Sequence, residues 1–127
     1  MSSSAFSVKV FGVYLVLAGC ALLLAPNAFL TMLWVPEAKE VWIRVLGSVV
    51  VIVGYYYWAC GKNDVKPFFG ASVYGRFFFF LCSGALVAFA DAPTVLLLFG
   101  VTDLFGAAWT MFALRGEGHD VLAAKVE

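Results

Sequence analysis

The sequence predicts an all-α protein, a bundle of four transmembrane helices, and three observations lead to this prediction. Of the 127 residues, 64% are hydrophobic, whereas soluble domains contain about half. Charged residues make up only 13%, about half of their usual fraction in soluble proteins. Four stretches stay apolar over about 20 residues, the length of a helix that crosses a hydrocarbon core of about 30 Å. The net charge of zero argues against a nucleic-acid-binding protein, which needs a basic surface.

The four predicted spans follow one another in a single integral membrane domain of residues 1–127. They cover residues 8–25, 41–60, 68–90 and 94–114, and a polar cytoplasmic tail, 115–127, follows them. Backbone polar groups within a bilayer have to be satisfied inside the span, so each span is expected to be helical. The apolar runs 49–53 and 77–80 do not alternate as the strands of a membrane barrel would.

Three breaks separate the spans. Pro26 ends the first one, and residues 27–34 are apolar but too short to cross the membrane, which predicts a segment at its interface. Polar residues 61–67 link the second and third spans. The sequence Asp91-Ala92-Pro93 predicts a tight turn between the third and fourth spans. These last two helices are therefore expected to be neighbours.

Basic residues near the span ends predict the orientation in the membrane. If both termini are cytoplasmic, the cytoplasmic side carries Lys9, Lys62, Lys66, Arg115 and Lys125, and the outer side carries Lys39. This asymmetry predicts a multi-pass protein with both termini in the cytoplasm. The tryptophans then mark the two membrane interfaces, with Trp34 and Trp42 at the outer one and Trp58 and Trp109 at the inner one.

Three charged residues fall clearly within the spans, and they are the main candidates for a functional site: Arg44, Arg76 and Asp103. A charge near the bilayer centre costs a few kcal/mol or more, so a partner is expected for each. At about 1.5 Å per residue, Arg76 lies about 12 Å from Phe68, and Asp103 lies about 15 Å from Pro93. These depths nearly coincide in a core of about 30 Å. We therefore predict an ion pair between Arg76 and Asp103.

Polar side chains share helical faces with these charges. Ser72 precedes Arg76 by four residues, and Ser48 and Tyr55 follow Arg44 by four and eleven residues. On the fourth span, Asp103, Gly106 and Thr110 share a face in the same way. Arg44 can extend to the outer surface, pair with Asp91 or reach Asp103. The candidate site therefore consists of Arg76, Asp103, Arg44, Tyr55, Ser72 and Ser48.

Three interpretations of this polar interior stay open. In the first, a buried salt bridge fixes the register of the helices. In the second, the polar faces enclose a pocket for a ligand, an ion or a proton. In the third, one of the charges faces a partner subunit.

The cysteines and the histidine predict no metal site and no cofactor. Cys20, Cys60 and Cys82 lack the C-x-x-C spacing, none has a histidine beside it, and His119 is the only histidine. The run Leu17-Ala18-Gly19-Cys20 resembles a lipoprotein cleavage box, but the apolar stretch continues beyond it, which favours a retained helix. Gly12 and Gly19 lie seven residues apart and could admit a close neighbouring helix.

Several short stretches resemble a family of small, uncharacterised bacterial four-helix inner-membrane proteins. The stretches are Val41-Trp42-Ile43-Arg44-Val45-Leu46-Gly47, Gly54-Tyr55-Tyr56, Pro67-Phe68-Phe69, Gly75-Arg76, Leu98-Phe99-Gly100 and Asp103-Leu104. The layout of the chain is also similar to that of DoxX-like membrane proteins. This resemblance implies a protein of the bacterial cytoplasmic membrane that often acts as an accessory to another protein, and it transfers no catalytic residue.

Two functions from different classes fit the sequence best. The first is a non-catalytic accessory or scaffold protein that binds a membrane protein partner or its own copies within the lipid bilayer. The second is a binding or transport protein for a small lipophilic or charged ligand, with Arg76 and Asp103 lining the site. An intramembrane enzyme acting on a lipid or a quinone is a third class, but the sequence offers it no nucleophile–base pair and no metal set.

Overall fold

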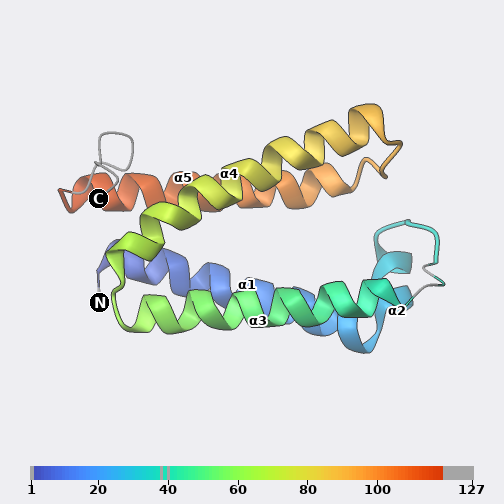
Figure 1. Cartoon of the computed structure of the whole chain (residues 1–127), viewed down its shortest axis with the longest axis horizontal. Helices are drawn as coiled ribbons and strands as arrows, with labels where there is room; N and C mark the ends of the chain where they lie inside the picture. Colours follow the sequence, from blue (N-terminus) through green and yellow to red (C-terminus); the bar gives the residue numbers. More distant parts are fainter. Residues whose placement is uncertain (1, 38, 40, 119–127) are drawn as a thin grey trace. The chain divides into compact units, whose positions relative to one another are not determined.

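The computed structural model describes residues 2–37, 39 and 41–118, and these residues form five helices (Figure 1). The helices are α1 (Ser3–Leu24), α2 (Pro26–Met32), α3 (Trp42–Lys62), α4 (Lys66–Phe89) and α5 (Leu96–Gly116). All of them except α2 are long and apolar enough to span a membrane. The prediction of an all-α protein with four spans is therefore confirmed.

The helices differ from the predicted spans mainly at their ends. Helix α1 begins at Ser3, five residues before the predicted start. Ser2 explains this difference, because its Oγ accepts a hydrogen bond from the backbone N–H of Ala5 at 3.2 Å and caps the helix. The predicted linker 61–67 shortens to residues 63–65. Pro67 is the second residue of α4, where its missing N–H breaks no helical hydrogen bond.

The short apolar segment after Pro26 is itself a helix, α2, of seven residues. Pro26 is its first residue, a position that tolerates proline for the same reason. Cys20 lies inside α1, which continues to Leu24, so the cleavage-box resemblance falls within a continuous helix. The connections after α3 and α4 contain Asp64 and Asp91 with positive φ angles, which aspartate tolerates better than most residues.

The chain comprises two compact units, which are described separately. Unit 1 is Met1–Val8 with Cys60–Glu127, and unit 2 is Lys9–Ala59. Unit 1 therefore contains the first two turns of α1 together with α4 and α5, whereas unit 2 contains the rest of α1, α2 and most of α3. The prediction of a single membrane domain stays a prediction.

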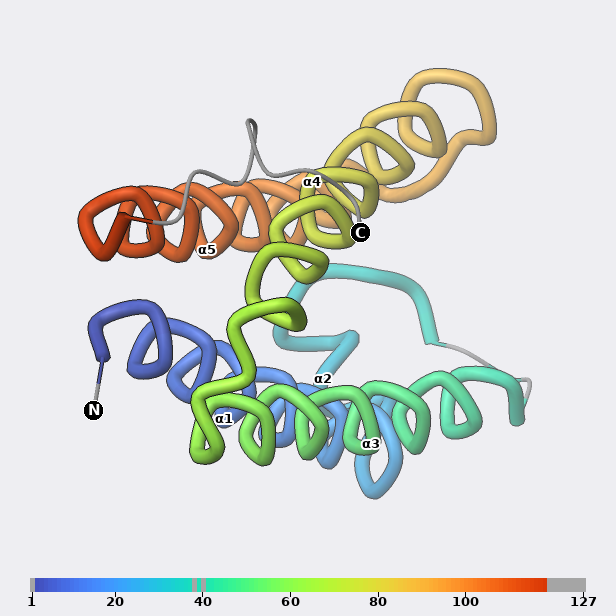
Figure 2. Tube along the Cα trace, turned by 60° about the vertical axis from the view of Figure 1, so that its left-hand side comes forward, coloured from blue at the N-terminus to red at the C-terminus, as the bar shows by residue number. Residues whose placement is uncertain are grey.

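In unit 2, α1 and α3 run side by side (Figures 1 and 2), and four glycines let them lie close together. A Cβ atom added to Gly12 would lie 2.8 Å from the carbonyl oxygen of Gly54, and one added to Gly19 would lie 2.8 Å from that of Gly47. Both distances are too short for a real Cβ contact. The helices can therefore be this close only because side chains are missing on both sides. The close neighbour expected for Gly12 and Gly19 is α3.

In unit 1, α4 and α5 form a hairpin of two helices joined by residues 90–95 (Figure 1). Gly100 allows their closest approach, because a Cβ atom added there would lie 2.9 Å from the Cβ of Ser83. The buried residues of α5 are Gly100, Ala107, Thr110 and Leu114, and those of α4 are Phe69, Ser72, Val73, Arg76 and Ser83. The beginning of α1 also contacts this hairpin, with the Phe6 ring edge-on to Trp109 at 6.0 Å.

Candidate functional site

Arg76 is at the centre of the polar interior of unit 1. Its side chain is only 2% exposed. Its Nε donates a hydrogen bond to the carbonyl oxygen of Ser72 at 3.2 Å. Its Nη2 donates to the hydroxyl of Ser72 at 3.0 Å and to the hydroxyl of Thr110 at 2.9 Å. The guanidinium therefore connects α4 to α5 through hydroxyl groups, which replace part of the hydration that the cation would have in water.

The hydroxyl groups next to Arg76 form a hydroxyl chain, a series of hydrogen bonds that are all donated in the direction away from Arg76. The Ser7 hydroxyl donates to the carbonyl oxygen of Ser4 at 2.7 Å. Because its single hydrogen is used there, the Thr110 hydroxyl has to donate in the 2.8 Å contact with Ser7. The chain then runs from Arg76 through Thr110 and Ser7 to the Ser4 carbonyl. Every dipole in it presents its oxygen toward Arg76, which stabilises the buried positive charge.

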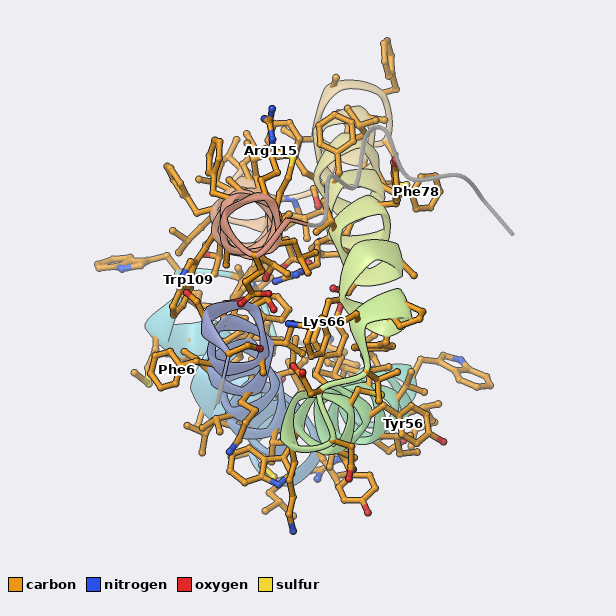
Figure 3. The ribbon with its side chains drawn as sticks, turned by 90° about the vertical axis from the view of Figure 1, so that its left-hand side faces the viewer. Phe6, Tyr56, Lys66, Phe78, Trp109 and Arg115 are labelled. Carbon is orange, nitrogen blue, oxygen red and sulfur yellow. The ribbon has the colours of Figure 1, made fainter. Side chains whose placement is uncertain are left out.

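A second polar cluster, the end cluster, lies at the first turn of α1 and consists of Ser2, Ser4, Asp64, Lys66 and Glu117. The Nζ of Lys66 donates to Glu117 Oε2 at 2.7 Å, to the Ser4 hydroxyl at 2.9 Å and to the Ser2 hydroxyl at 3.0 Å. Glu117 also accepts from the Ser4 hydroxyl at 2.6 Å and from the Ser4 backbone N–H at 2.9 Å. Figure 3 shows Lys66 extending toward α1.

The end cluster changes the acidity of its carboxyl groups. Partial burial raises the pKa of Glu117, but hydrogen bonds from Lys66 and Ser4 outweigh it and bring the pKa to about 2. The hydrogen bond from Ser2 lowers the pKa of Asp64, which also lies 3.3 Å from the Nζ of Lys66. Both carboxylates are therefore ionised at neutral pH, and together they hold the lysine.

Asp103 lies on α5 two turns from Thr110, toward the Leu96 end of the helix. It shares a helical face with the buried residues Gly100, Ala107 and Thr110, and it is partly exposed. The charge of Arg76 acts on it electrostatically. The hydrogen bonds described above direct Arg76 to hydroxyl groups, so a direct Arg76–Asp103 ion pair stays a prediction.

The other three predicted site residues, Arg44, Ser48 and Tyr55, lie in unit 2 and form local contacts there. Arg44 Nη1 donates to the carbonyl oxygen of Leu23 at 2.6 Å, near the end of α1. The Ser48 hydroxyl donates to the carbonyl oxygen of Val45 within α3 at 2.7 Å. Tyr55 is exposed, and its ring lies 6.3 Å from that of Tyr56. The predicted convergence of these residues with Arg76, and the contacts predicted for Arg44 with Asp91 and Asp103, stay predictions.

The residues that could bind a metal do not gather in the described part of the chain. No group of three or more His, Cys, Asp and Glu residues is found within residues 2–37, 39 and 41–118. Cys20, Cys60 and Cys82 are free thiols. His119 lies outside the described residues.

Sequence reasoning did not find Ser4, Ser7 or Glu117. The predicted first span began at residue 8, which left both serines in a tail, and Glu117 was placed in the polar tail that follows the last span. The spacing of Ser4 and Ser7, one helical turn apart and directly before the apolar run, was the available signal. Thr110 was placed on the polar face of its helix but not among the site residues.

Comparisons with protein-family models, with curated proteins and with solved structures found no match for this chain.

Proposed function

We propose that this chain is a small, non-catalytic protein of accessory or scaffold type in the bacterial cytoplasmic membrane, with both termini in the cytoplasm. One observation carries the proposal: the Nη2 of Arg76 donates to the hydroxyls of Ser72 and Thr110, within the protein's own helices. A membrane-buried arginine used in this way stabilises helix packing. The similarity in layout to DoxX-like proteins is in keeping with an accessory role.

The position of Arg76 favours packing over ligand binding. A ligand that used the Nη2 of Arg76 would have to displace the hydroxyls of Ser72 and Thr110, which accept its hydrogen bonds at 3.0 and 2.9 Å. Hydrogen bonds to a charged group stabilise by about 1.5–3 kcal/mol each. Displacing both is therefore a substantial penalty for an incoming ligand.

The outward side chains of the hairpin favour a role in contacting lipid and other membrane proteins. Phe78, Phe105 and Phe112 are all exposed, and Phe78 points away from α5 in Figure 3. Such side chains suit the acyl chains of the bilayer or the apolar surface of a neighbouring span. We therefore propose a membrane protein partner, or further copies of the chain, as the binding partner.

The experiment is native mass spectrometry of protein extracted gently from its own membrane. The test variant combines Arg76→Leu with Asp103→Leu. The control combines Arg115→Leu with Glu37→Leu, which also removes one charge of each sign, at two exposed positions. If the protein has an accessory role, a protein partner should co-purify with it in a fixed stoichiometry. The same partner should co-purify with both variants. Extraction as a bare monomer, from wild type and control alike, would contradict the accessory role.

A second function, binding or transport of a small lipophilic or charged ligand, is supported by Asp103. Asp103 is a partly exposed residue in a stripe of otherwise buried residues. Ionisable groups at this depth commonly belong to ligand or proton sites. In the same experiment, a bound molecule of defined mass that is lost only from the Arg76→Leu/Asp103→Leu variant would favour this function.

A further inference from the structure

The connection between α1 and α3 in unit 2 exposes large apolar side chains. Met32, the last residue of α2, is 77% exposed, and Trp34 is 96% exposed. The flanking residues Leu24, Val41 and Trp42 are exposed as well. Burying a side chain of this size is worth about 1.5–3 kcal/mol. If this connection lay in water, these apolar side chains would stay unburied, and the stabilisation from burying each of them would be lost.

The backbone N–H groups directly after α2 are satisfied within the segment. The backbone N–H groups of Leu33 and Val35 both donate to the carbonyl oxygen of Leu30, at 3.0 and 2.9 Å. The N–H of Trp34 donates to Thr31 at 3.1 Å, and the Thr31 hydroxyl donates to the carbonyl oxygen of Asn27 at 2.7 Å. Because these groups already have partners in the protein, they can enter an apolar environment without losing hydrogen bonds.

Charge and length favour a segment at the membrane surface over one that crosses the membrane. Residues 26–36 contain no charged side chain, and Glu37 is the first one after them. At about 1.5 Å per residue, the seven residues of α2 extend only about 10 Å, a third of the hydrocarbon core. The segment joins the end of one span to the start of the next, and Figure 1 shows α2 at that end of the α1–α3 pair. Exposed apolar side chains also flank it at the end of α1, with Leu24, and at the start of α3, with Trp42.

Trp34 combines an unusual backbone conformation with a fully exposed ring. Its φ of 60° is left-handed, a conformation that costs an ordinary residue about 1–2 kcal/mol. The strained residue thus carries the most exposed large side chain in the described part of the chain. Tryptophan is enriched where hydrocarbon meets the lipid headgroups, because its ring is apolar and its N–H donates a hydrogen bond.

We propose that α2 and the turn after it bind the lipid surface of the bilayer itself, with Met32 and Trp34 inserted at the boundary between headgroups and acyl chains. This inference is independent of the accessory or scaffold role, because it concerns only the connection between two spans of unit 2. It makes the segment an anchor that sets the depth of α1 and α3 in the membrane.

The experiment measures tryptophan fluorescence in liposomes. In the test protein, the substitutions Trp42→Phe, Trp58→Phe and Trp109→Phe leave Trp34 as the only tryptophan. In the matched control, Trp34→Phe, Trp42→Phe and Trp58→Phe leave Trp109, which is part of α5. Circular dichroism shows whether both variants keep their helices. The tryptophan fluorescence of each protein is then measured with three quenchers: aqueous iodide, lipids brominated close to the headgroup, and lipids brominated deep in the acyl chain.

We expect Trp34 to be quenched several-fold more strongly by the shallow brominated lipid than by the deep one, and to be shielded from iodide. Trp109, which the sequence predicts at the inner interface, is the reference for an interfacial tryptophan and should also prefer the shallow brominated lipid. Two results would overturn the proposal. Full quenching of Trp34 by iodide would place it in water, and protection from iodide and both lipids would show that protein covers it.

Discussion

The two units of this chain use opposite chemistry to bring membrane helices together. In unit 2, α1 and α3 meet where four glycines remove side chains from both surfaces. In unit 1, α4 and α5 are joined by a buried arginine that donates hydrogen bonds to hydroxyls on both helices. Helices in lipid gain little from burying apolar surface against each other, so close backbone packing and polar contacts provide the attraction. The comparison teaches that packing in unit 2 depends on shape, whereas packing in unit 1 depends on charge and hydrogen bonding.

The largest expected effect belongs to Arg76 in unit 1. We predict that Arg76→Leu lowers the free energy of unfolding by about 3 kcal/mol, because it removes the hydrogen bonds to the hydroxyls of Ser72 and Thr110 and the positive charge that acts on Asp103. Adding Asp103→Leu should recover the part of this loss that comes from Asp103, whereas the part that comes from Ser72 and Thr110 should remain. Reversible unfolding in mixed micelles measures both variants. A double variant that is less stable than Arg76→Leu alone would show that Asp103 is held by something other than Arg76.

The corresponding change in unit 2 is steric. We predict that Gly47→Ala destabilises the protein by about 1–3 kcal/mol, because the new Cβ would lie 2.6 Å from the backbone nitrogen of Leu23. Gly84→Ala in α4 is the matched control, because nothing lies within 4 Å of its added Cβ. The control should be neutral or slightly stabilising, since alanine favours a helix over glycine by about 1 kcal/mol. Equal effects in the two variants, measured by unfolding, would rule out glycine packing in unit 2.

A smaller effect is expected from the hydroxyl chain of unit 1. We predict that Thr110→Val costs about 1–2 kcal/mol, because it removes an acceptor for Arg76 while preserving the shape of the side chain. Thr102→Val is the control on the same helix, because its hydroxyl donates only to the carbonyl oxygen of Leu98. The unfolding free energies of the two variants give the comparison. If Thr102→Val is as costly as Thr110→Val, the hydroxyl chain has no special role.

The smallest effect concerns pH and the end cluster. The folded pKa of Glu117 is about 2, below its ordinary value of 4.5, so folding favours the ionised form. The stabilisation is fully present above about pH 4.5 and is lost as the pH falls toward 2. Because the cluster is near the surface, solvent screening keeps this effect to about 1 kcal/mol.

The measurement for this prediction is the unfolding free energy of wild type and Glu117→Gln between pH 6 and pH 3. The difference between the two should shrink as the pH falls. A difference that stays constant with pH would show that the carboxylate charge does not stabilise the cluster.

The apolar composition predicted the four spans, because crossing a bilayer imposes a length and a hydropathy that local sequence carries. The pairing of Gly12 and Gly19 with a neighbour also followed from spacing. The partner glycines, Gly47 and Gly54, required the three-dimensional register of α1 and α3. Depth estimates along straight helices placed Arg76 near Asp103, but they did not include the direction of the arginine side chain. That direction depends on the hydroxyls of Thr110 and Ser7, which come from two other helices.

The most direct test of the account is a double-mutant cycle between Arg76 and Thr110 in reversible unfolding. It uses Arg76→Leu, Thr110→Val and the combination of the two. The account predicts a coupling free energy of about 1 kcal/mol, at the upper end of what hydrogen bonds between membrane helices contribute. Additive effects, with no coupling, would contradict the claim that Arg76 holds the α4–α5 hairpin through its hydroxyl partners.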